Sequence, residues 1–285
     1  MAAVLGTNVA SLWASKNLQS AQSNMANSVE RLSSGLRINR ARDDAAGLGL
    51  ANALTQQINA SDQGIRNLND GISIVQTAEG ALSQVSEMAQ RILTLAIQAS
   101  NGTLNSKQLA SITGEMKALI TGIDSIQTRT KFSGTALLGG SAIAIYNGKE
   151  SSDKVDITAP ALASVNSTGA ATTLSGWITT AHSTGVDALT APANYQSIAT
   201  SASSYITALD TQRGLLGALQ NQMEYSVSNI TELSANLTSA RSRIIDTDYA
   251  SETANLTKGQ ILQQAATAML AQANQMPNVI LSLLK

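Results

Sequence analysis

The sequence predicts a mainly α protein: an elongated antiparallel coiled-coil or helical-bundle rod with a small β-hairpin and a short variable insertion. Apolar residues recur at alternating three- and four-residue spacing over segments well beyond ~25 residues, which indicates coiled coils or extended bundles. Only 3% of the residues are aromatic, and the apolar residues are mainly Ala, Leu, Ile and Val, which suits long helices packed through small side chains. Both ends of the chain carry little charge, so each needs an apolar partner, and the other end is the simplest one.

Composition and charge argue against several classes of function. The chain has no cysteine, which excludes disulfides, zinc–thiolate sites and cysteine nucleophiles. Its formal net charge is −1, which gives no electrostatic reason to expect nucleic acid or an anionic membrane as a partner. The only histidine, His182, has no second histidine or carboxylate cluster near it in the sequence. We therefore expect no metal, no cofactor and no catalytic residue, and the chain is not expected to be an enzyme.

Residues 1–42 are expected to form one half of a terminal helical module, with residues 246–285 as the other half. The pattern predicts a helix from Met1 to about Leu36. Its seam has coiled-coil spacing and consists of Met25, Val29, Leu32 and Leu36. The N-terminus lacks the basic region and apolar core of a secretory signal peptide. The many Gln and Asn residues of the C-terminal run make it a poor transmembrane helix.

A charged neck follows the first helix. It concentrates charged side chains at Arg37, Arg40, Arg42, Asp43 and Asp44. Asp43 or Asp44 is expected to cap the next helix, because a carboxylate accepts hydrogen bonds from free backbone N–H groups and lies at the positive end of the helix dipole. The neck therefore marks the boundary with a second module, which comprises residues 43–158 and 197–245.

Long helices are predicted for this second module. A heptad-like stripe predicts a helix over residues 44–100, and an uninterrupted three-four pattern predicts another over residues 106–128, folded back antiparallel on the first. Helical periodicity resumes near Gln196 and runs to a second charged neck. That neck contains Arg241, Arg243, Asp246 and Asp248. The order of the elements is therefore nearly a mirror image about the middle of the chain, as a chain folded back on itself requires.

The middle of the chain is expected to hold a connector, a hairpin and an insertion. Residues 130–140 are predicted to be a Gly/Ser connector. Alternating apolar residues on either side of Asn147-Gly148 predict a β-hairpin whose strands carry Ile143, Ile145, Val155 and Ile157. Residues 159–196 contain no Lys, Arg or Glu and are rich in Ser, Thr, Ala and Gly, which predicts a short, surface-exposed variable insertion.

Four stretches of the sequence resemble bacterial flagellins. The first neck, LSSGLRINRARDDAAGL (residues 32–48), is similar to the neck signature of that family. TNVASL (7–12) resembles the flagellin N-terminus, and RGLLGALQNQME (213–224) resembles its returning core helix. RSRIIDTDYASETANLTKGQILQQ (241–264) resembles its C-terminal segment. Together with the long helices, the resemblance covers residues 1–141 and 197–285.

The resemblance implies a structural subunit of the extracellular bacterial flagellar filament, exported without a cleaved signal peptide. In that family the paired terminal helices line an inner tube, the long helices form an outer tube, and the variable segment faces solvent. The implied partners are further copies of the chain in a helical homopolymer, an export chaperone that covers the C-terminal helix, a filament cap and hook-associated proteins. The residues agree with this, because head-to-tail contacts that do not close into a ring generate helical filaments.

Candidate polymerisation contacts are apolar residues of the two ends and charged or apolar residues of the first neck. They are Leu5, Val9, Leu12, Leu36, Arg37, Asp43, Asp44, Ile261, Leu270, Val279, Leu281 and Leu284. Large apolar surfaces that are covered only on assembly explain why these ends carry so little charge.

A second candidate surface rests on the resemblance alone. QRILTLAIQASNGT (residues 90–103) is similar to the surface that the animal innate-immune flagellin receptor reads. The positions that match those recognised by the receptor are Arg91, Leu95, Gln98 and Glu115. The chain departs from the usual pattern at Leu93 and Thr94, where charged residues are common.

Functions from other classes are weighed against the filament subunit. A hook–filament junction protein is the nearest alternative, since it shares the terminal helices and this approximate size, but the intact C-terminal run favours the filament subunit. A membrane-active secretion translocator would need a convincing apolar span. An enzyme or a sugar-binding protein would have to be carried on the insertion, whose few charged and aromatic residues offer little support.

Overall fold

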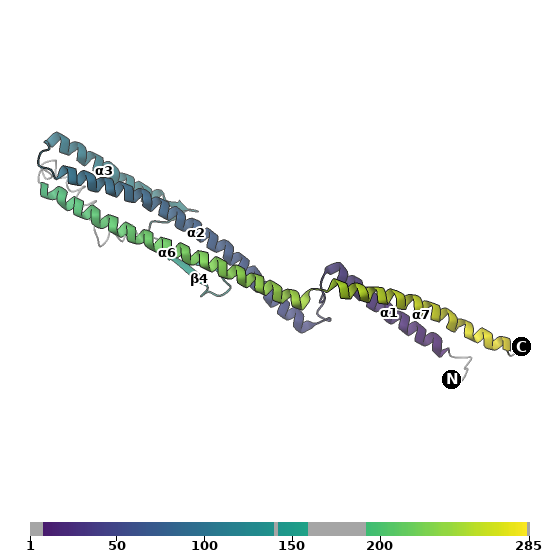
Figure 1. The fold of residues 1–285 in the computed structure, drawn as a ribbon. Helices are drawn as coiled ribbons and strands as arrows, with labels where there is room; N and C mark the ends of the chain where they lie inside the picture. The colour runs from purple at the N-terminus through teal and green to yellow at the C-terminus, as the bar shows by residue number, and fades with distance from the viewer. Residues whose placement is uncertain (1–7, 140–141, 159–191, 284–285) are drawn as a thin grey trace. The chain divides into compact units, whose positions relative to one another are not determined.

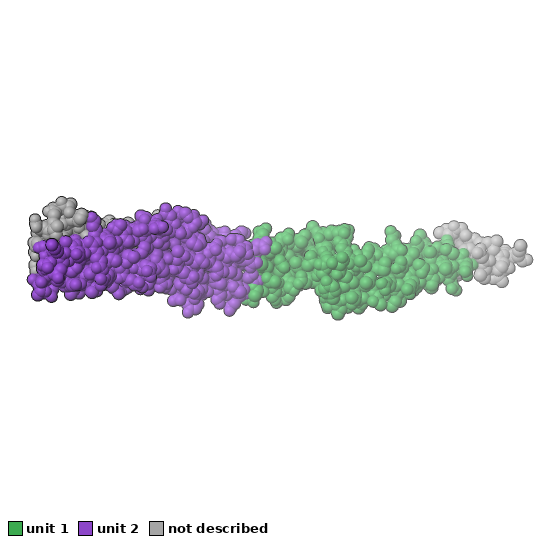
Figure 2. All heavy atoms as spheres, turned by 90° about the horizontal axis from the view of Figure 1, so that it is seen from above, with its two compact units in different colours: residues 1–58, 235–285 green, residues 59–234 purple. Residues whose placement is uncertain are grey.

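The computed structural model describes residues 8–139, 142–158 and 192–283, with only the backbone described at residues 158, 192, 193 and 276–283. Within these ranges the chain is mainly helical, as predicted, with five α-helices and two small antiparallel hairpins (Figure 1). The chain divides into two compact units, coloured separately in Figure 2. Unit 1 comprises residues 1–58 and 235–285, and unit 2 comprises residues 59–234. Residues 159–191 of the predicted insertion lie outside the described residues.

Three long helices supply the framework of unit 2: α2 (Ala45–Ala99), α3 (Ser106–Arg129) and α6 (Pro192–Ile245). The first two match their predicted ranges to within one residue at each end. Helix α6 corrects the prediction, because it begins at Pro192 and so includes the last residues of the expected insertion. Proline suits the first position of a helix, where its missing N–H would have no intrahelical partner. The N-terminal part of α2 (residues 45–58) and the C-terminal part of α6 (residues 235–245) belong to unit 1.

Side-chain caps explain where α2 and α3 begin. Asp44 Oδ1 accepts a hydrogen bond from the backbone N–H of Gly47 (2.8 Å), which confirms the prediction of a carboxylate cap at the start of α2. At the start of α3, Asn105 and Gln108 form a reciprocal capping box, in which each side chain accepts a bond from the other's backbone N–H (both 3.0 Å).

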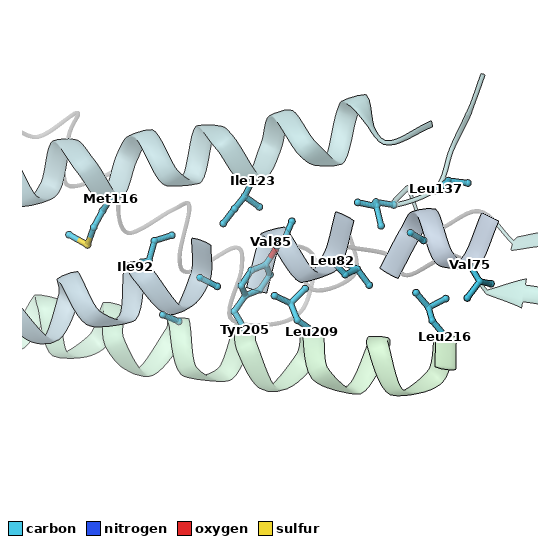
Figure 3. Close-up of a cluster of buried hydrophobic side chains, with 14 of the residues drawn as sticks. Val75, Leu82, Val85, Ile92, Met116, Ile123, Leu137, Tyr205, Leu209 and Leu216 are labelled. Carbon is cyan, nitrogen blue, oxygen red and sulfur yellow. The ribbon is translucent and has the colours of Figure 1, made fainter. Parts of the chain in front are cut away.

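The core of unit 2 lies between these three helices (Figure 3). Side chains of all three helices meet there, and those labelled in the figure include Val75, Leu82, Val85 and Ile92 of α2, Met116 and Ile123 of α3, and Tyr205, Leu209 and Leu216 of α6. The α2 residues repeat at the predicted heptad-like spacing, which confirms the stripe over this stretch. Burial raises the pKa of the Tyr205 phenol, with a smaller contribution from Asp124.

The predicted hairpin is present. Strand β3 (Ala142–Tyr146) pairs antiparallel with β4 (Lys154–Thr158), with Ile143 opposite Ile157 and Ile145 opposite Val155. The side chains of Ile145, Val155 and Ile157 are buried in the core of unit 2. Alternation in the sequence therefore located both strands and the face that packs inward.

The predicted Gly/Ser connector holds a second, smaller hairpin that the sequence analysis missed. Strand β1 (Lys131–Phe132) pairs with β2 (Thr135–Ala136). The intervening residues Ser133 and Gly134 both have positive φ, at 48° and 86°. Positive φ at both central residues is the geometry of a two-residue hairpin turn, for which Ser-Gly was the available signal. Strands of two residues are too short to show alternation.

Unit 1 is built on the antiparallel pair α1 (Val9–Ser34) and α7 (Tyr249–Leu283). The side chain of Asn8 caps α1 by accepting from the N–H of Ser11, and α1 ends at Gly35, whose φ of 72° is left-handed. Asp248 begins α7 by accepting from the N–H of Ala250 (3.0 Å). Among the described residues, no helix combines the length and apolar character needed to cross a membrane.

Candidate assembly surface

Helices α1 and α7 pack along a seam with coiled-coil spacing, in which every third or fourth residue is buried or half-buried. The pair is antiparallel. Asn8 Nδ2 at the start of α1 donates to the carbonyl of Ala273 late in α7 (2.7 Å), while Arg31 at the other end lies 3.7 Å from Glu252. The buried seam positions are Ala14, Ala21 and Ser28 of α1 and Glu252, Gly259 and Ala273 of α7.

This seam corrects the one predicted for α1. Met25 and Leu32 lie on it and are half-buried, but Val29 is exposed, and its neighbour Ser28 takes the buried position. The small seam residues let the two backbones approach within 8 Å along the pair. Large apolar residues mark a seam in the sequence more clearly than alanine, serine and glycine do, so the buried seam positions were not predicted.

Large apolar side chains of both helices lie outside the seam. Leu12 is 68% exposed and Met269 is 66% exposed. In the described part of the pair, the buried apolar side chains are all alanines. The other large exposed side chains of the pair are Val9, Trp13, Val29, Tyr249, Ile261 and Leu262. Unit 1 thus presents an apolar surface that water covers in the single chain.

A groove of about 600 Å³ runs between α1 and α7 beside the seam. Its apolar lining includes Trp13, Ala14 and Ala21 of α1 and Leu262, Ala266 and Met269 of α7. The ammonium group of Lys16 lies 5.3 Å from the centre of the Trp13 ring, so one cation meets the aromatic face at this end. A groove of this chemistry suits the apolar face of another helix.

Polar groups occupy the other end of the seam. The Glu252 carboxylate is buried beside the Arg31 guanidinium, and Ser28 lines the same polar groove. A slip of one helix along the other would leave the carboxylate in the seam without its cation. The pair therefore favours one register of α1 on α7.

In unit 1 the first predicted neck is hydrogen-bonded to the second, so the chain segments that follow α1 and precede α7 are held together. Its backbone contacts join Leu36 with Asp246, Arg37 with Ile245, and Gly35 with Thr247. The Arg37 guanidinium also donates to the carbonyl of Ile244, near the C-terminal end of α6, where a cation is favourable. Two of the predicted contacts, Leu36 and Arg37, thus have a role within the chain itself.

Asp43 and Asp44 also have local roles. Asp43 Oδ2 accepts from the backbone N–H groups of Arg40 (3.0 Å) and Asn39 (3.2 Å). These bonds, that of Arg40 foremost, lower the pKa of the Asp43 carboxyl. Asp44 caps α2, as described above. Both residues are exposed, so their caps and turns leave them accessible on unit 1.

The remaining predicted contacts fall into groups. Val9, Leu12 and Ile261 are exposed on unit 1, and Leu270 is half-buried on the seam. Leu5 and Leu284 lie outside the described residues, and only the helical backbone is described at Val279 and Leu281. Trp13, Leu262 and Met269, which line the groove, were not among the predicted contacts. The seven-residue spacing of Leu262 and Met269 was the signal that would have found the groove.

The residues of the second candidate surface do not all lie on the surface. The Arg91 guanidinium forms an exposed ion pair with Glu115 (2.7 Å), which joins α2 to α3, and Gln98 is exposed. Leu95, in contrast, is only 2% exposed and belongs to the core of unit 2. It lies three residues after Ile92 on the buried stripe, so it is a packing residue in this fold.

The sequence is similar to those of known bacterial flagellins. Residues 5–142 match the bacterial flagellin N-terminal helical region, and residues 199–284 match the bacterial flagellin C-terminal helical region. The chain is 36% identical to a flagellin of Halalkalibacterium halodurans, with 99% of this chain and 100% of the relative covered. It is 39% identical to a flagellin of Xenorhabdus nematophila, with 100% of both chains covered.

A solved structure is similar as well. The crystal structure of Bacillus cereus flagellin has a TM-score of 0.47 and 24% sequence identity to this chain, and the match covers 62% of this chain and 94% of that one. In sequence, both helical regions of the family are matched, and the relatives are covered over their whole length. The chain therefore belongs to the bacterial flagellins, the structural subunits of the extracellular flagellar filament.

Proposed function

We propose that this flagellin polymerises through the α1–α7 pair, and that the groove between the two helices receives a second copy of the chain. One observation carries the proposal: in the described part of the pair the buried apolar side chains are all alanines, while Trp13, Leu262 and Met269 remain in contact with water. Burial of apolar surface stabilises an assembly by about 25 cal/mol per Å². A second copy would therefore supply the burial that the pair lacks.

The contact is proposed to be head-to-tail. Val9, Leu12 and Ile261 are exposed but do not line the groove, so one copy can place these apolar side chains in the groove of the next. Such a contact does not close on itself and propagates into a helical filament. On this proposal, residues 1–42 and 246–285 form the inner tube, residues 43–158 and 197–245 the outer tube, and residues 159–196 an exposed insertion.

The same surface suits the predicted export chaperone. Before assembly, the exposed side chains of α7 are an association hazard, and a partner that covers Ile261, Leu262 and Met269 would remove it. The filament cap and hook-associated proteins are proposed to meet the subunit at the ends of the polymer. Membership of the flagellins identifies a structural protein, and we propose no catalytic activity for it.

An innate-immune receptor remains a proposal of narrower scope. Arg91, Gln98 and Glu115 offer an exposed, charged surface on α2 and α3 that a receptor could contact. Leu95 would contribute only by supporting that surface from the core. Binding of the monomer to the receptor, with Arg91, Gln98 and Glu115 replaced together by Ala, tests this contact. If the variant binds the receptor as well as the unmodified chain does, the proposed contact is wrong.

Seeded polymerisation tests the assembly surface. Full-length monomer carrying both Leu262→Ser and Met269→Ser is added to short filament fragments, and elongation is followed by negative-stain electron microscopy. We expect elongation to fail, because two apolar side chains of the groove become polar. Leu215→Ser, at an exposed leucine of unit 2, is the matched control and should elongate.

The outcomes separate the alternatives. If the control is as inactive as the double variant, loss of any exposed apolar side chain suffices and the groove has no special role. If the unmodified chain never elongates on seeds, the proposed polymerisation through this groove is contradicted. Far-ultraviolet circular dichroism of each monomer checks that the helices are intact.

A further inference from the structure

A second groove lies wholly in unit 2, between the tip of the β3–β4 hairpin and one face of α6. Its volume is about 640 Å³, within the range of roughly 300–1,000 Å³ found for small-ligand sites. The polar and aromatic residues that line it are Asn147, Asn221, Gln222, Tyr225, Ser226 and Asn229. Its lining contains no charged residue. The groove is independent of the proposed polymerisation surface, because no residue of α1 or α7 lines it.

The hairpin side of the groove is held in place by α2. Asn67 Nδ2 donates to the carbonyl of Tyr146 (2.8 Å), and the N–H of Asn147 donates to the carbonyl of Asp153 across the hairpin (2.9 Å). Gly64 lies directly against Asn147, since a Cβ at that position would come closer than 3.0 Å to the Asn147 carbonyl. Asn147 is therefore fixed before any ligand arrives.

The α6 side is a stripe of polar residues at three- and four-residue spacing. Among the described residues, the side chains of Asn221, Gln222 and Asn229 have no hydrogen-bond partner, although each is exposed at the groove. Across from them, Asn147 Oδ1 is shielded from solvent and accepts no hydrogen bond in the described structure. Polar atoms shielded in this way are usually paired, so Oδ1 is an exception on the hairpin side of the groove, whereas the exposed amides of α6 are the groups that a ligand can reach.

Tyr225 gives the groove an aromatic surface. Its side chain is 78% exposed, more than the other large apolar side chains identified as exposed in the described structure. If the Tyr225 side chain were buried, packing in the core would explain why a tyrosine stands at this position. The side chain is mostly exposed, so packing does not explain it. Its ring offers an apolar face, and its hydroxyl both donates and accepts hydrogen bonds.

We propose that this groove binds a neutral saccharide. Sugar hydroxyl groups donate and accept hydrogen bonds at once, and a carboxamide offers both functions within one side chain. The apolar C–H face of a pyranose ring can pack on the ring of Tyr225. The uncharged lining gives no counter-ion for a phosphate, a sulfate or a carboxylate.

A peptide strand fits the groove less well. Recognition of an extended peptide uses a free sheet edge together with pockets for alternate side chains. The apolar remainder of the lining is Ala218 and Ile230, which provides no deep pocket for a large side chain. The geometry therefore favours a flat, hydroxyl-rich ligand, and peptide binding becomes an alternative outcome of the test.

A glycan array tests the proposal with the full-length monomer. The array carries neutral hexose and N-acetylhexosamine oligosaccharides, sialylated and sulfated glycans, and extended peptides. We expect binding to neutral oligosaccharides. Tyr225→Ala should weaken it by about tenfold, the equivalent of one aromatic contact, whereas Tyr225→Phe should retain most of it. The double substitution Asn221→Ala with Asn229→Ala should also weaken binding. Gln90 is an exposed amide on α2, away from the groove, and Gln90→Ala should leave binding unchanged.

Several results would overturn the assignment. These are the absence of binding to every neutral oligosaccharide, preference for acidic glycans or peptides, and equal binding by Tyr225→Ala and the unmodified chain. Since Tyr225 is exposed, its replacement leaves the core intact, and circular dichroism verifies this. Seeded elongation of Tyr225→Ala is measured in parallel, so that a failure of saccharide binding and a failure of polymerisation are read separately.

Discussion

The α1–α7 pair and the core of unit 2 share a periodicity but differ in what they bury. Both place packed residues three and four apart along helices. In unit 2 those positions carry many large residues beside alanines, with Leu68, Leu82 and Met223 all 0% exposed. In the described part of the pair, the fully buried positions carry alanine, serine, glycine and a single carboxylate, and the larger seam residues, such as Met25 and Leu270, are only half-buried. Side-chain size, not spacing, separates the two regions.

This difference decides how complete each region is. Small seam residues bring α1 and α7 within 8 Å of each other and leave their large apolar side chains outside. Large residues in unit 2 fill the space between three helices and leave that core closed (Figure 3). Periodicity thus shows which face packs, and residue size shows whether the packing is finished within one chain. The pair is the region that still needs a partner.

Truncating a leucine in each region is expected to give the largest contrast. Leu82→Ala in the closed core leaves a cavity and should cost about 2–5 kcal/mol of the free energy of unfolding. Leu262, the matched residue on α7, is 48% exposed. Leu262→Ala should change the free energy of unfolding of the monomer by about 0.5 kcal/mol or less. Urea unfolding measures both, and equal losses would erase the distinction.

Removing a helix cap in each region is expected to have a smaller effect. Asn105 caps α3 in unit 2, and Asn8 caps α1 in unit 1. Replacement of either by Ala costs about 1 kcal/mol. Asn105→Ala should lower the stability of the unit 2 core, because α3 packs on it. Asn8→Ala should speed hydrogen exchange in α1 and α7 alone, and faster exchange in the α3 core after that substitution would contradict the separation of the two regions.

The smallest expected contrast between the two regions is in how stability depends on pH, through the buried Tyr205 of unit 2 and the exposed Tyr249 of the pair. It should be seen just above the ordinary tyrosine pKa of 10.0. Burial raises the pKa of Tyr205, so the folded protein keeps this proton where the unfolded chain releases it. The contribution of Tyr205 to stability is therefore fully present below pH 10 and is lost as the pH rises above it. Tyr205→Phe should flatten this fall, measured by urea unfolding across the alkaline range. Tyr249→Phe, at the exposed tyrosine of α7, is the control and should leave the fall in place.

Much of the fold could be predicted from the sequence where large residues marked the pattern. The heptads of α2 and α3 and the alternation around Asn147-Gly148 gave bounds close to those observed. The α1 seam could not be found in this way, because Ala14, Ala21 and Ser28 are common on solvated faces too. Leu95 is a related case: its resemblance to a surface position gave no sign that it lies on the buried stripe, where it is 2% exposed.

The candidate sites were less predictable than the fold. The exposure of predicted contact residues such as Leu12 and Ile261 could be expected from the charge-poor ends. The groove of unit 2 did not, because Asn221, Gln222 and Asn229 read as an ordinary solvated helix face. Their significance depends on Asn147, which the hairpin brings to α6 from far away in the sequence. Such a juxtaposition has no local signal.

The hydrogen bond between Asn8 and Ala273 closes a loop of chain, because the two residues are 265 positions apart. The entropic cost of closing a loop rises with its length. A hydrogen bond from Ser234 Oγ to Asp62 Oδ1 ties α6 to α2 inside unit 2, so most of that loop is already closed when unit 2 has folded. We therefore expect an order of folding set by chain connectivity, with the core first and the terminal pair last. A chain cut short before α7 would fold its core and leave α1 with nothing to pair with.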